Sequence, residues 1–440
     1  LTPALRMPPK KKDGKKKSAV SDEPGQKPED LLSTYTAFVK KIGLPPNGEV
    51  TAALADDGGE NPYRGKQIIV DGGDDPSDTT KQLGPGGCRA LATAIMGSHP
   101  TMPKHPETGQ PMLYKTLQEL RIWGANIGDD GASSIAEVLR LGGAEIQLQY
   151  LELTNNGITA IGAFALGRSL SCMMNLSLIT LNLDYNMSLG SEGVAALSQG
   201  LRTNSTLKKL SLRYCNLDSE AGAPLGEVLN FTRCGLNILD IQGNHIGGTG
   251  LMELCPGLQN NKSLTKLIIA DNDISDSSSE DEEGLKKFAG VLLVHPTLTS
   301  VDLLYNRIGY FARHLIPAVD VPSGGNKNIV EFRVDASLDD DMYAKLNKMG
   351  GGKGKKGKKG KKKCDATLKE DVVQVRGRGD TSRPAVYEFR YKGSYERERG
   401  LMAQELLCDD RWRNAVSVEM DEEDGLHLEV DAEFVDLATK

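Results

Sequence analysis

The sequence is poor in aromatic residues and has no long apolar run. Only 5% of its 440 residues are Phe, Trp or Tyr, and no apolar segment reaches the length that crosses a bilayer. No secretory signal precedes the body of the sequence, so we expect a cytoplasmic protein without membrane insertion. Seven scattered cysteines form no Cys-x-x-Cys pair, which is typical of reduced thiols and argues against a disulfide framework.

Signatures of metal binding and catalysis are also missing. The six histidines show no metal-ligand spacing and have no neighbouring cysteine. An acidic stretch that starts at Asp271 imitates a calcium loop, but its sixth position is Asp276, where such loops need glycine. We therefore expect no metal, no cofactor and no enzymatic activity. Five Asn-x-Ser/Thr triplets occur, and we interpret them as chance matches; they include Asn175, Asn186 and Asn204.

Positive charge is concentrated in two short segments. The net charge of the chain is −7, yet residues 10–17 carry +5 and residues 351–363 carry +8, which leaves −20 on the remainder. Lysine and glycine runs of this kind resist folding, because like charges repel and glycine maximises backbone entropy. We expect a disordered Lys-rich tail over residues 1–27 and a flexible Lys/Gly linker over residues 350–364.

The central half of the chain repeats one eleven-residue phrase, L-x-x-L-x-L-x-x-N-x-L, seven times. A degenerate eighth copy begins at Ile329 and keeps only Ile329, Phe332 and Val334 as apolar residues. A repeat of this period indicates a solenoid of stacked units, none of which buries its apolar face alone. The seven copies begin at Leu117, Leu148, Leu178, Leu207, Leu236, Leu264 and Leu298.

Each unit is predicted to run strand, turn, helix. Positions 4 and 6 of the phrase alternate as in a strand, and apolar residues at helical spacing follow each turn. Position 9 carries an amide that can tie one coil to the next; it is Asn156, Asn186, Asn244, Asn272 and Asn306. Cys215 replaces this amide once. The first copy has Ala125 there and Asn126 one residue later, so we expect a one-residue slip of that turn.

The phrase resembles the ribonuclease-inhibitor-like class of leucine-rich repeats. The resemblance implies an α/β solenoid of horseshoe shape, with parallel strands on the inner curve and helices on the outer curve. We place the repeats in residues 117–349 and an N-terminal helix and capping unit in residues 28–116. A small α+β domain is expected in residues 365–440.

The flanking segments have their own patterns. A helix is expected that opens at Pro28, closes with Lys40 and Lys41 and is stopped by Gly43. A capping strand that carries Ile68 and Val70 and a capping helix over residues 87–96 are expected to follow. In the C-terminal segment we expect a strand over residues 387–391, a helix over residues 395–408 and a hairpin around residues 421–425.

The inner face supplies the candidate surface for a protein partner. Side chains between the buried leucines point away from the core, and aromatic and arginine side chains dominate the energy of interfaces. The competing interpretation is that the aromatic residues pack against neighbouring coils. The face is mixed in sign, which argues against nucleic acid. The candidate residues are Arg121, Trp123, Tyr150, Glu152, Tyr185, Arg213, Tyr214, Asp240 and Tyr305.

An acidic insertion lengthens the sixth repeat. Ser277, Ser278 and Ser279 precede acidic residues there, as substrates of an acid-directed kinase do. Phosphorylation would add charge to an exposed loop. The alternative is a loop that serves solubility alone, and the sequence does not separate the two.

These observations favour a non-enzymatic interaction scaffold, a monomer within a larger complex. The opening Met7-Pro-Pro-Lys-Lys-Lys is similar to the start of many axonemal proteins, and the repeats are similar to those of the nexin–dynein regulatory complex and the radial spokes. That resemblance implies a scaffold in the ciliary axoneme, with tubulin-associated partners. The alternative is a GTPase-activating protein of the Ran type, which shares this repeat class.

Overall fold

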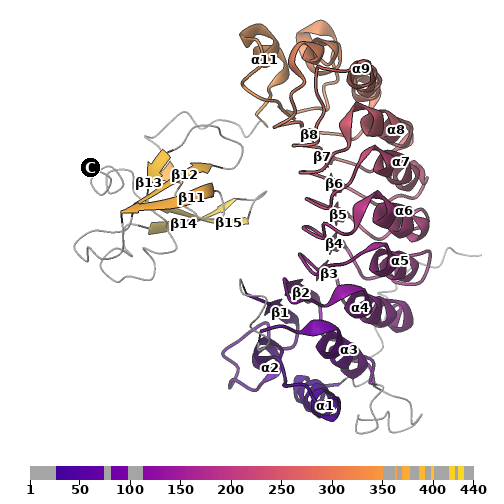
Figure 1. The fold of residues 1–440 in the computed structure, drawn as a ribbon, viewed down its shortest axis with the longest axis vertical. Coiled ribbons are helices and arrows are strands. Elements are labelled where there is room, and N and C mark those ends of the chain that lie inside the picture. Colours follow the sequence, from indigo (N-terminus) through magenta and orange to yellow (C-terminus); the bar gives the residue numbers. More distant parts are fainter. Residues whose placement is uncertain are drawn as a thin grey trace, which may run out of the picture. The chain divides into compact units, whose positions relative to one another are not determined.

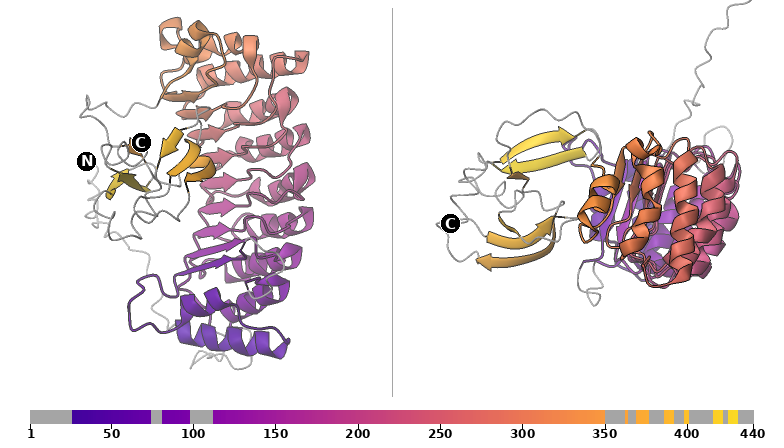
Figure 2. Two further views of the ribbon diagram at one scale, coloured as in Figure 1. Left: turned by 60° about the vertical axis from the view of Figure 1, so that its left-hand side comes forward. Right: turned by 90° about the horizontal axis from the view of Figure 1, so that it is seen from above.

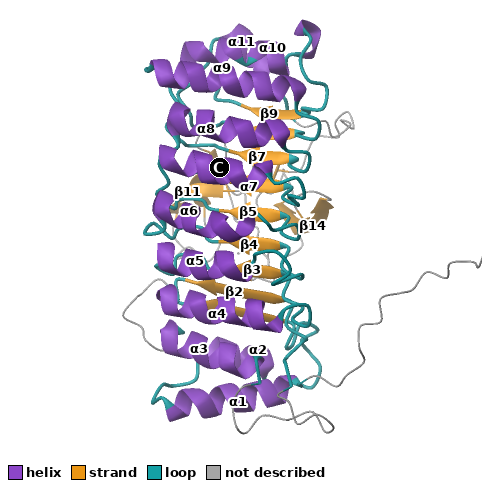
Figure 3. Ribbon diagram, turned by 90° about the vertical axis from the view of Figure 1, so that its right-hand side faces the viewer, coloured by secondary structure: helices purple, strands orange, loops and turns teal. Residues whose placement is uncertain are grey.

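A parallel sheet of nine strands runs through the computed structural model, with one strand per coil (Figure 1). The structure describes residues 26–73, 81–97 and 112–349, together with six short strands between residues 362 and 430. Strands β1 to β9 follow one another in sequence order and line one side of the array, and the helices line the other side (Figure 2). Seen from the helix side, the helices form a row in front of the strands (Figure 3).

The elements alternate regularly along the chain. The strands are β1 (Gln67–Asp71), β2 (Glu119–Trp123), β3 (Tyr150–Glu152), β4 (Thr180–Asn182), β5 (Lys209–Ser211), β6 (Ile238–Asp240), β7 (Lys266–Ile268), β8 (Ser300–Asp302) and β9 (Glu331–Arg333). The helices are α1 (Pro28–Lys41), α2 (Gly48–Leu54), α3 (Gly84–Ile95), α4 (Gly128–Gly142), α5 (Ala160–Ser169), α6 (Gly190–Leu201), α7 (Gly222–Asn230), α8 (Gly247–Asn260), α9 (Ser279–Val294), α10 (Ile316–Val319) and α11 (Asp340–Leu346).

The strands pair in strict register, which stacks equivalent residues of successive coils. The fourth residues of the phrases lie directly opposite one another and are buried, because each faces the helices across the sheet. The turn of the first copy shows no slip: Ala125 occupies the buried ninth position, so that expectation was wrong. The stacked row is Leu120, Leu151, Leu181, Leu210, Leu239, Leu267, Val301 and Phe332.

Neighbouring helices approach closely where glycine faces glycine. A Cβ added at Gly200 would lie 1.7 Å from the carbonyl oxygen of Gly167, and one added at Gly257 would lie 2.1 Å from that of Gly226. No side chain fits in such a gap, so these glycines set the spacing between α5 and α6 and between α7 and α8. The short spacing keeps the helix row compact on the outer side of the array.

A capping unit closes the first edge of the sheet. Helix α1 buries Leu31, Tyr35 and Val39 against the core that α3 and β1 share, and Gly43 follows it with a φ of +77°. The expected helix from Pro28 is therefore present and docks on the first coil. Helix α2 was not expected; Asn47 caps it by accepting hydrogen bonds from the backbone of Glu49 and Val50.

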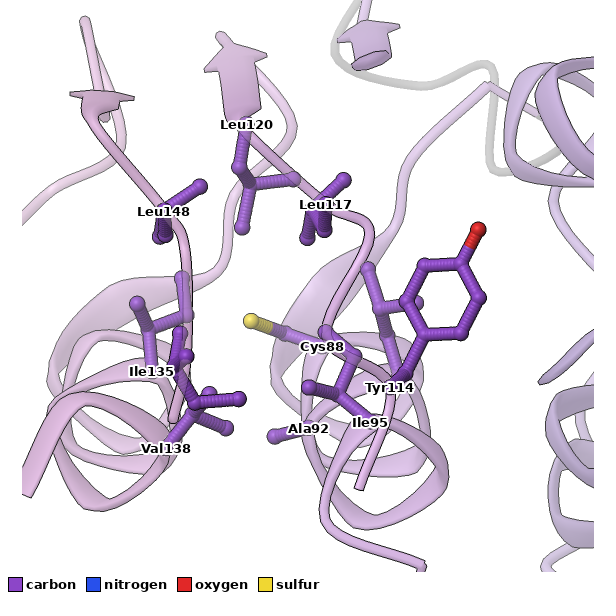
Figure 4. Close-up of a pocket in the computed structure, with 11 residues that line it drawn as sticks. Cys88, Ala92, Ile95, Tyr114, Leu117, Leu120, Ile135, Val138 and Leu148 are labelled. Carbon is purple, nitrogen blue, oxygen red and sulfur yellow. The ribbon is translucent and has the colours of Figure 1, made fainter. Parts of the chain in front are cut away.

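Packing between α3 and α4 leaves a small enclosed cavity of about 10 Å³ (Figure 4). Cys88, Ala92 and Ile95 reach it from α3, and Ile135 and Val138 reach it from α4. The lining is apolar, so the cavity offers no partner that would hold a water molecule. Burial raises the pKa of the Cys88 thiol to about 12, which makes this sulfur a core residue and not a nucleophile.

The last strand does not end in an open edge. After β9 the chain passes through α11 and returns, and Phe332 exchanges backbone hydrogen bonds with Lys348 in an antiparallel bridge. The amino group of Lys348 also donates to the carbonyl oxygen of Ile329. This return protects β9 from pairing with another chain.

Residues 351–440 form a separate compact unit. Its strands make two antiparallel sheets, ordered β10-β15-β14 and β11-β12-β13. The expected strand over residues 387–391 and the expected hairpin are present as β12 and as β14 with β15. The strands are β10 (Lys362–Lys363), β11 (Lys369–Arg376), β12 (Val386–Tyr391), β13 (Glu398–Gly400), β14 (Val416–Asp421) and β15 (Gly425–Val430).

Two expectations about this C-terminal region need correction. Residues 398–400 form a strand that pairs with β12, so the helical pattern over residues 395–408 is broken by sheet pairing. Lys362 and Lys363, expected in a linker without structure, pair with β15. The tail over residues 1–25 and most of the linker lie outside the described residues.

None of the described helices is both long enough and apolar enough to span a membrane. Among the same residues, His, Cys, Asp and Glu side chains nowhere gather in a group of three that would suit a metal ion. The described cysteines are free thiols: Cys88, Cys215 and Cys255 are buried, Cys234 is half-buried, and Cys172 is exposed.

Candidate functional site

The strand-side turns are fixed by a buried ladder of side-chain amides. In each full coil with asparagine at position 9, Nδ2 donates to a backbone carbonyl of the preceding coil at 2.7–2.9 Å. Cys215 takes the same place, and its Sγ lies 3.2 Å from the carbonyl oxygen of Leu183. We call these residues the strand-side ladder: Asn156, Asn186, Cys215, Asn244, Asn272 and Asn306.

Position 8 of the phrase lies next to this ladder and adopts left-handed backbone angles in all seven full coils, with φ between +51° and +71°. Glycine, asparagine and aspartate tolerate this region, whereas a bulky L-residue there costs about 1–2 kcal/mol. Three coils nevertheless place tyrosine at this position. The seven residues are Gly124, Asn155, Tyr185, Tyr214, Gly243, Asp271 and Tyr305.

Two of these tyrosines stack across adjacent coils. The rings of Tyr185 and Tyr214 lie 4.9 Å apart between centroids, with an interplanar angle of 18°. Tyr214 rests on the next coil, since a Cβ added at Gly243 would lie 2.1 Å from its ring. Tyr214 therefore packs against the neighbouring coil, as the competing interpretation of the aromatic residues predicts. Tyr185 packs on one side only and remains 47% exposed.

Arginine and buried carboxylates surround this pair. The guanidinium of Arg213 lies 5.9 Å from the centroid of the Tyr214 ring, and its Nε lies 3.9 Å from Oδ2 of Asp240. Burial raises the pKa of the Asp240 carboxyl to about 6, although the charge of Arg213 opposes this shift. Asp184 lies beside Tyr185 in sequence; its Oδ1 accepts from the Ser211 hydroxyl at 2.7 Å and from the Arg213 amide at 2.8 Å.

A second group of candidate residues lies on β2 and β3. The Arg121 guanidinium covers the Tyr150 ring at 4.7 Å and lies 3.8 Å from Oε2 of Glu152. The Tyr150 hydroxyl donates to the same oxygen at 3.2 Å, and burial raises the pKa of Tyr150 to about 12. Arg121, Tyr150 and Glu152 thus form a complete trio of arginine, tyrosine and carboxylate.

The structure divides the nine candidate residues between these groups. Tyr185, Arg213, Tyr214 and Asp240 form one group on coils three to five, and Arg121, Tyr150 and Glu152 form the other. Trp123 is half-buried at the end of β2, and Tyr305 is half-buried on the seventh coil, in neither group. Sequence reasoning missed Asp184, which stands at position 7 of the third copy, where no other full copy has an acidic residue.

Comparisons with known proteins agree with this geometry. A family model described as leucine-rich repeat matches residues 115–136, 147–167, 203–226, 229–255 and 260–278. These segments of the chain are leucine-rich repeats, and the chain is similar to proteins of the ribonuclease-inhibitor-like class. Leucine-rich repeat proteins generally mediate protein–protein interactions.

Three relatives show the extent of the similarity. Human "NACHT, LRR and PYD domains-containing protein 5" is 36% identical over 171 residues, 38% of this chain and 12% of that protein. Human "NACHT, LRR and PYD domains-containing protein 12" is 30% identical over 195 residues, 44% of this chain and 17% of that protein. Mouse "Ribonuclease inhibitor" is 27% identical over 195 residues, 44% of this chain and 40% of that protein. The matches therefore span less than half the length of each relative.

The leucine-rich repeats contain a second ladder that the sequence reasoning missed. Asn204 donates to the carbonyl oxygen of Leu170 at 2.7 Å and accepts from the amides of Thr206 and Leu207. Asn261 and Asn326 repeat this bonding between coils, and His295 accepts two backbone amides at the equivalent place. We call Asn204, Asn261, His295 and Asn326 the helix-side ladder.

Three of the Asn-x-Ser/Thr triplets have a structural role instead of accepting a glycan. Asn175, Asn204 and Asn261 are buried, and each accepts hydrogen bonds from the backbone amides two and three residues later. The signal is that each lies three residues before the first leucine of a phrase, at Leu178, Leu207 and Leu264. Burial of these amides leaves no room for a glycan.

The three serines of the acidic insertion start a helix. Ser278 caps α9: its Oγ accepts from the amide of Asp281 at 3.0 Å and donates to Oδ2 of that residue. Asp281 is buried and also binds the amide of Gly248 on the preceding coil. The expectation of an exposed loop was therefore wrong for the acidic residues, which form the first turn of α9, while Ser277 and Ser279 are exposed.

Proposed function

We propose that the protein is a non-enzymatic scaffold that holds one protein partner on its strand-lined face, as a monomer within a larger complex. The observation that carries the proposal is tyrosine at a left-handed turn position in three coils. Smaller residues serve this position elsewhere in the array at less conformational cost. The rings of Tyr185, Tyr214 and Tyr305 must therefore contribute something other than the local turn.

The proposed contact surface joins the two groups of candidate residues. It runs from Arg121, Tyr150 and Glu152 on β2 and β3 to the Tyr185, Arg213, Tyr214 and Asp240 group, with Trp123 and Tyr305 toward its two ends. Aromatic and arginine side chains beside charges of both signs suit a protein surface better than a nucleic-acid backbone. The support is chemical: one exposed ring, Tyr185, and four half-buried rings lie among polar groups that the sheet already holds in place.

Proximity labelling in a ciliated cell tests this proposal. We compare the full chain with a strand-face variant, Tyr185→Asn with Asp240→Lys, and with a control on the helix side, Ile161→Glu. Ile161 is 70% exposed on α5, so its change leaves the strand face intact. The scaffold proposal expects the strand-face variant alone to lose a defined set of neighbours. Equal sets for all three proteins would overturn it.

The basic segments are proposed to hold the acidic tails of tubulin in the ciliary axoneme. Residues 10–17 and 351–363 concentrate positive charge on an otherwise acidic chain. Attraction between exposed charges falls off over about 10 Å at 0.1 M salt, so binding through these segments weakens steeply as salt rises. Microtubule co-sedimentation over a salt series, with the lysines of residues 10–17 and 353–361 changed to glutamine, checks this. Salt-insensitive binding that survives these changes would remove the segments from the proposal.

The alternative to a non-enzymatic scaffold is a GTPase-activating protein of the Ran type. The measurement is GTP hydrolysis by purified small GTPases of the Ran family, with and without the full chain. We expect an unchanged rate. Stimulation that the strand-face variant abolishes would reassign the same surface to catalysis.

We also propose that an acid-directed kinase modifies Ser277 or Ser279. Both are exposed and both precede Asp281 and Glu282. Ser278 is disfavoured, because a phosphate there would displace the cap of α9 and meet the buried carboxylate of Asp281. Phosphopeptide mapping after treatment with such a kinase should find Ser277 or Ser279; modification at Ser278 alone would contradict this assignment.

A further inference from the structure

The chain twice builds the same trio of arginine, tyrosine and carboxylate. On coils one and two, Arg121 covers the ring of Tyr150 and faces Glu152. Near the end of the array, the Arg313 guanidinium lies 3.8 Å from the centroid of the Tyr310 ring and its Nη2 lies 3.2 Å from Oε1 of Glu282. In each trio, the planar guanidinium lies over the ring and within 4 Å of the carboxylate, although the closest carboxylate to Arg121 is that of Glu119.

Coil three carries a tyrosine and a carboxylate at adjacent positions, Tyr185 and Asp184, without an arginine over the ring. Tyr185 stacks on Tyr214 with one ring face and is 47% exposed. Among the described residues, no arginine or lysine lies over the Tyr185 ring. The coil on its open side carries only Asn155 at the eighth position, a side chain too short to cover a tyrosine ring.

The carboxylate beside Tyr185 has one oxygen that no described residue donates to and that is not among the fully buried atoms without a partner. Asp184 is only 6% exposed, and both of its side-chain hydrogen bonds are accepted by Oδ1, from Ser211 and from the Arg213 amide. Its Oδ2 accepts no hydrogen bond from any residue in the described part of the chain. A carboxylate taken so far out of water is stabilised by an additional charged donor.

Neighbouring charges leave room for one more cation. Glu152 and Asp240 are also more than nine-tenths buried, and the arginines that face them lie at 3.8 and 3.9 Å, too far for a close ion pair. The negative charge of Asp184 contributes to the raised pKa of Asp240, so these two carboxylates repel one another. A guanidinium at Asp184 would relieve this repulsion.

We propose that Tyr185 and Asp184 form a receptor for an arginine side chain of the partner protein. This inference rests on the scaffold function proposed above and names the chemistry of its partner. The guanidinium stacks on the open face of the Tyr185 ring and donates to Oδ2 of Asp184, which completes the trio that the chain makes for itself elsewhere. Lysine fits less well, because an ammonium group has no plane to stack on the ring.

Isothermal titration with two heptapeptides tests the receptor directly. The full chain is titrated with hepta-arginine and with hepta-lysine, which carry equal charge and differ in the planar group. We expect hepta-arginine to bind several-fold more tightly. Equal affinities for the two peptides would overturn the proposal, because general attraction to an acidic chain does not distinguish them.

Four variants locate the effect. Tyr185→Asn introduces the residue that the second coil has at the same turn position, Asn155, so it removes the ring without backbone strain. We expect hepta-arginine to bind this variant about tenfold more weakly and the affinity for hepta-lysine to stay within about twofold. Tyr185→Phe keeps the ring and should keep the preference for arginine. Asp184→Asn should weaken both peptides. Tyr63→Ala is the matched control, a tyrosine that is 62% exposed outside the strand face, and should change neither.

The two proposals fail in different ways. If the strand-face variant loses its cellular neighbours while both peptides bind the full chain equally, the scaffold stands and the arginine receptor is wrong. If Tyr185→Asn abolishes the preference for arginine while cellular neighbours are unaffected by the strand-face variant, the receptor stands and the scaffold contact lies elsewhere. Unchanged hepta-arginine binding to Tyr185→Asn overturns the receptor whatever the cell experiment shows.

Discussion

The strand-side and helix-side ladders tie the same coils together with the same chemistry, yet only one of them is part of the repeat phrase. In both ladders, an asparagine Nδ2 donates to a carbonyl of the preceding coil, as Asn244 does on one side and Asn204 on the other. The strand-side residues occur at a fixed place in a phrase of constant length. The helix-side residues lie in connections whose length varies, so their register appears only when it is counted back from the next leucine.

The difference shows that regularity in sequence and regularity in space are separate properties. A stacked coil must satisfy its buried backbone groups at both of its bends, whether or not the chain length between the bends is constant. The strand-side ladder is the more deeply buried of the two, and its asparagines other than Asn272 bond with both Oδ1 and Nδ2. We therefore expect the strand-side ladder to contribute more to stability.

The largest effect is expected at Asn244. Replacing it with alanine leaves the carbonyl of Leu212 and the amides of Cys215 and Leu217 without partners in the core, while the carbonyl of Ile241 keeps only its bond from Asn272. Because each buried unsatisfied group costs about 1–3 kcal/mol before relaxation, we expect a loss of about 4 kcal/mol. Urea denaturation followed by circular dichroism measures it. Asn260→Ala, an exposed amide on α8, is the control and should stay within about 0.5 kcal/mol.

A smaller loss is expected from Asn204→Ala on the helix side. The carbonyl of Leu170 and the amides of Thr206 and Leu207 lose their partner, but the amide of Thr206 is only partly buried and can turn to water. We expect about 2 kcal/mol in the same denaturation assay. A loss equal to that of Asn244→Ala would show that the two ladders contribute alike.

Within the strand-side ladder, Asn272 should matter less than Asn244. Its Nδ2 donates to the carbonyls of Ile241 and Ala270, but its Oδ1 is buried and accepts no hydrogen bond from the described residues. That missing partner already weakens the native state, so removal of the side chain forfeits fewer bonds. We expect Asn272→Ala to cost about 1–2 kcal/mol, less than Asn244→Ala in parallel denaturation curves. A larger loss at Asn272 would contradict this ranking.

The smallest effect is a pH dependence at His295. Its Nδ1 accepts from the amides of Thr297 and Leu298, so the ring is neutral when folded, and burial lowers the pKa of the imidazole below its usual 6.5. The unfolded chain therefore binds a proton before the folded chain does, and stability falls as pH drops below about 6.5. His295→Asn supplies an acceptor that does not titrate.

Denaturation of the His295→Asn variant and of the parent chain at pH 7.5 and pH 5 measures this effect. We expect the variant to gain about 1 kcal/mol relative to the parent at the lower pH, and almost nothing at the higher pH. The difference between the two proteins removes the contribution of other titrating groups such as Asp240. Parallel stability curves would show that His295 does not titrate in this range.

Much of the array could be predicted because its signal is periodic. The strand positions, the buried asparagines and even the weak eighth copy follow from one phrase, and the structure stacks Leu120 through Phe332 in a single row. The slip expected at Ala125 was wrong because pairing of β2 with its neighbours on both sides holds the turn in register. The strand at residues 398–400 was missed because its pairing with β12 outweighs a local helical pattern.

The candidate site was predictable in composition but not in arrangement. The sequence singled out Tyr185, Tyr214 and Arg213 as inner-face residues. It gave no sign that Tyr214 rests on Gly243 while Tyr185 stays open on one ring face. Asp184 was missed because a single aspartate in a repeat carries no signal until its burial and its hydrogen bonds to Ser211 and Arg213 are visible.

The sequence by itself determined the solenoid, its repeat length and the identity of the residues that face inward, because a fixed spacing of apolar residues permits only one way to stack the units. Only the tertiary structure decided which inner side chains are already satisfied by their neighbours. Contacts between coils join residues about thirty positions apart, and whether a ring is covered or a carboxylate oxygen is left without a donor depends on those contacts and not on the local sequence.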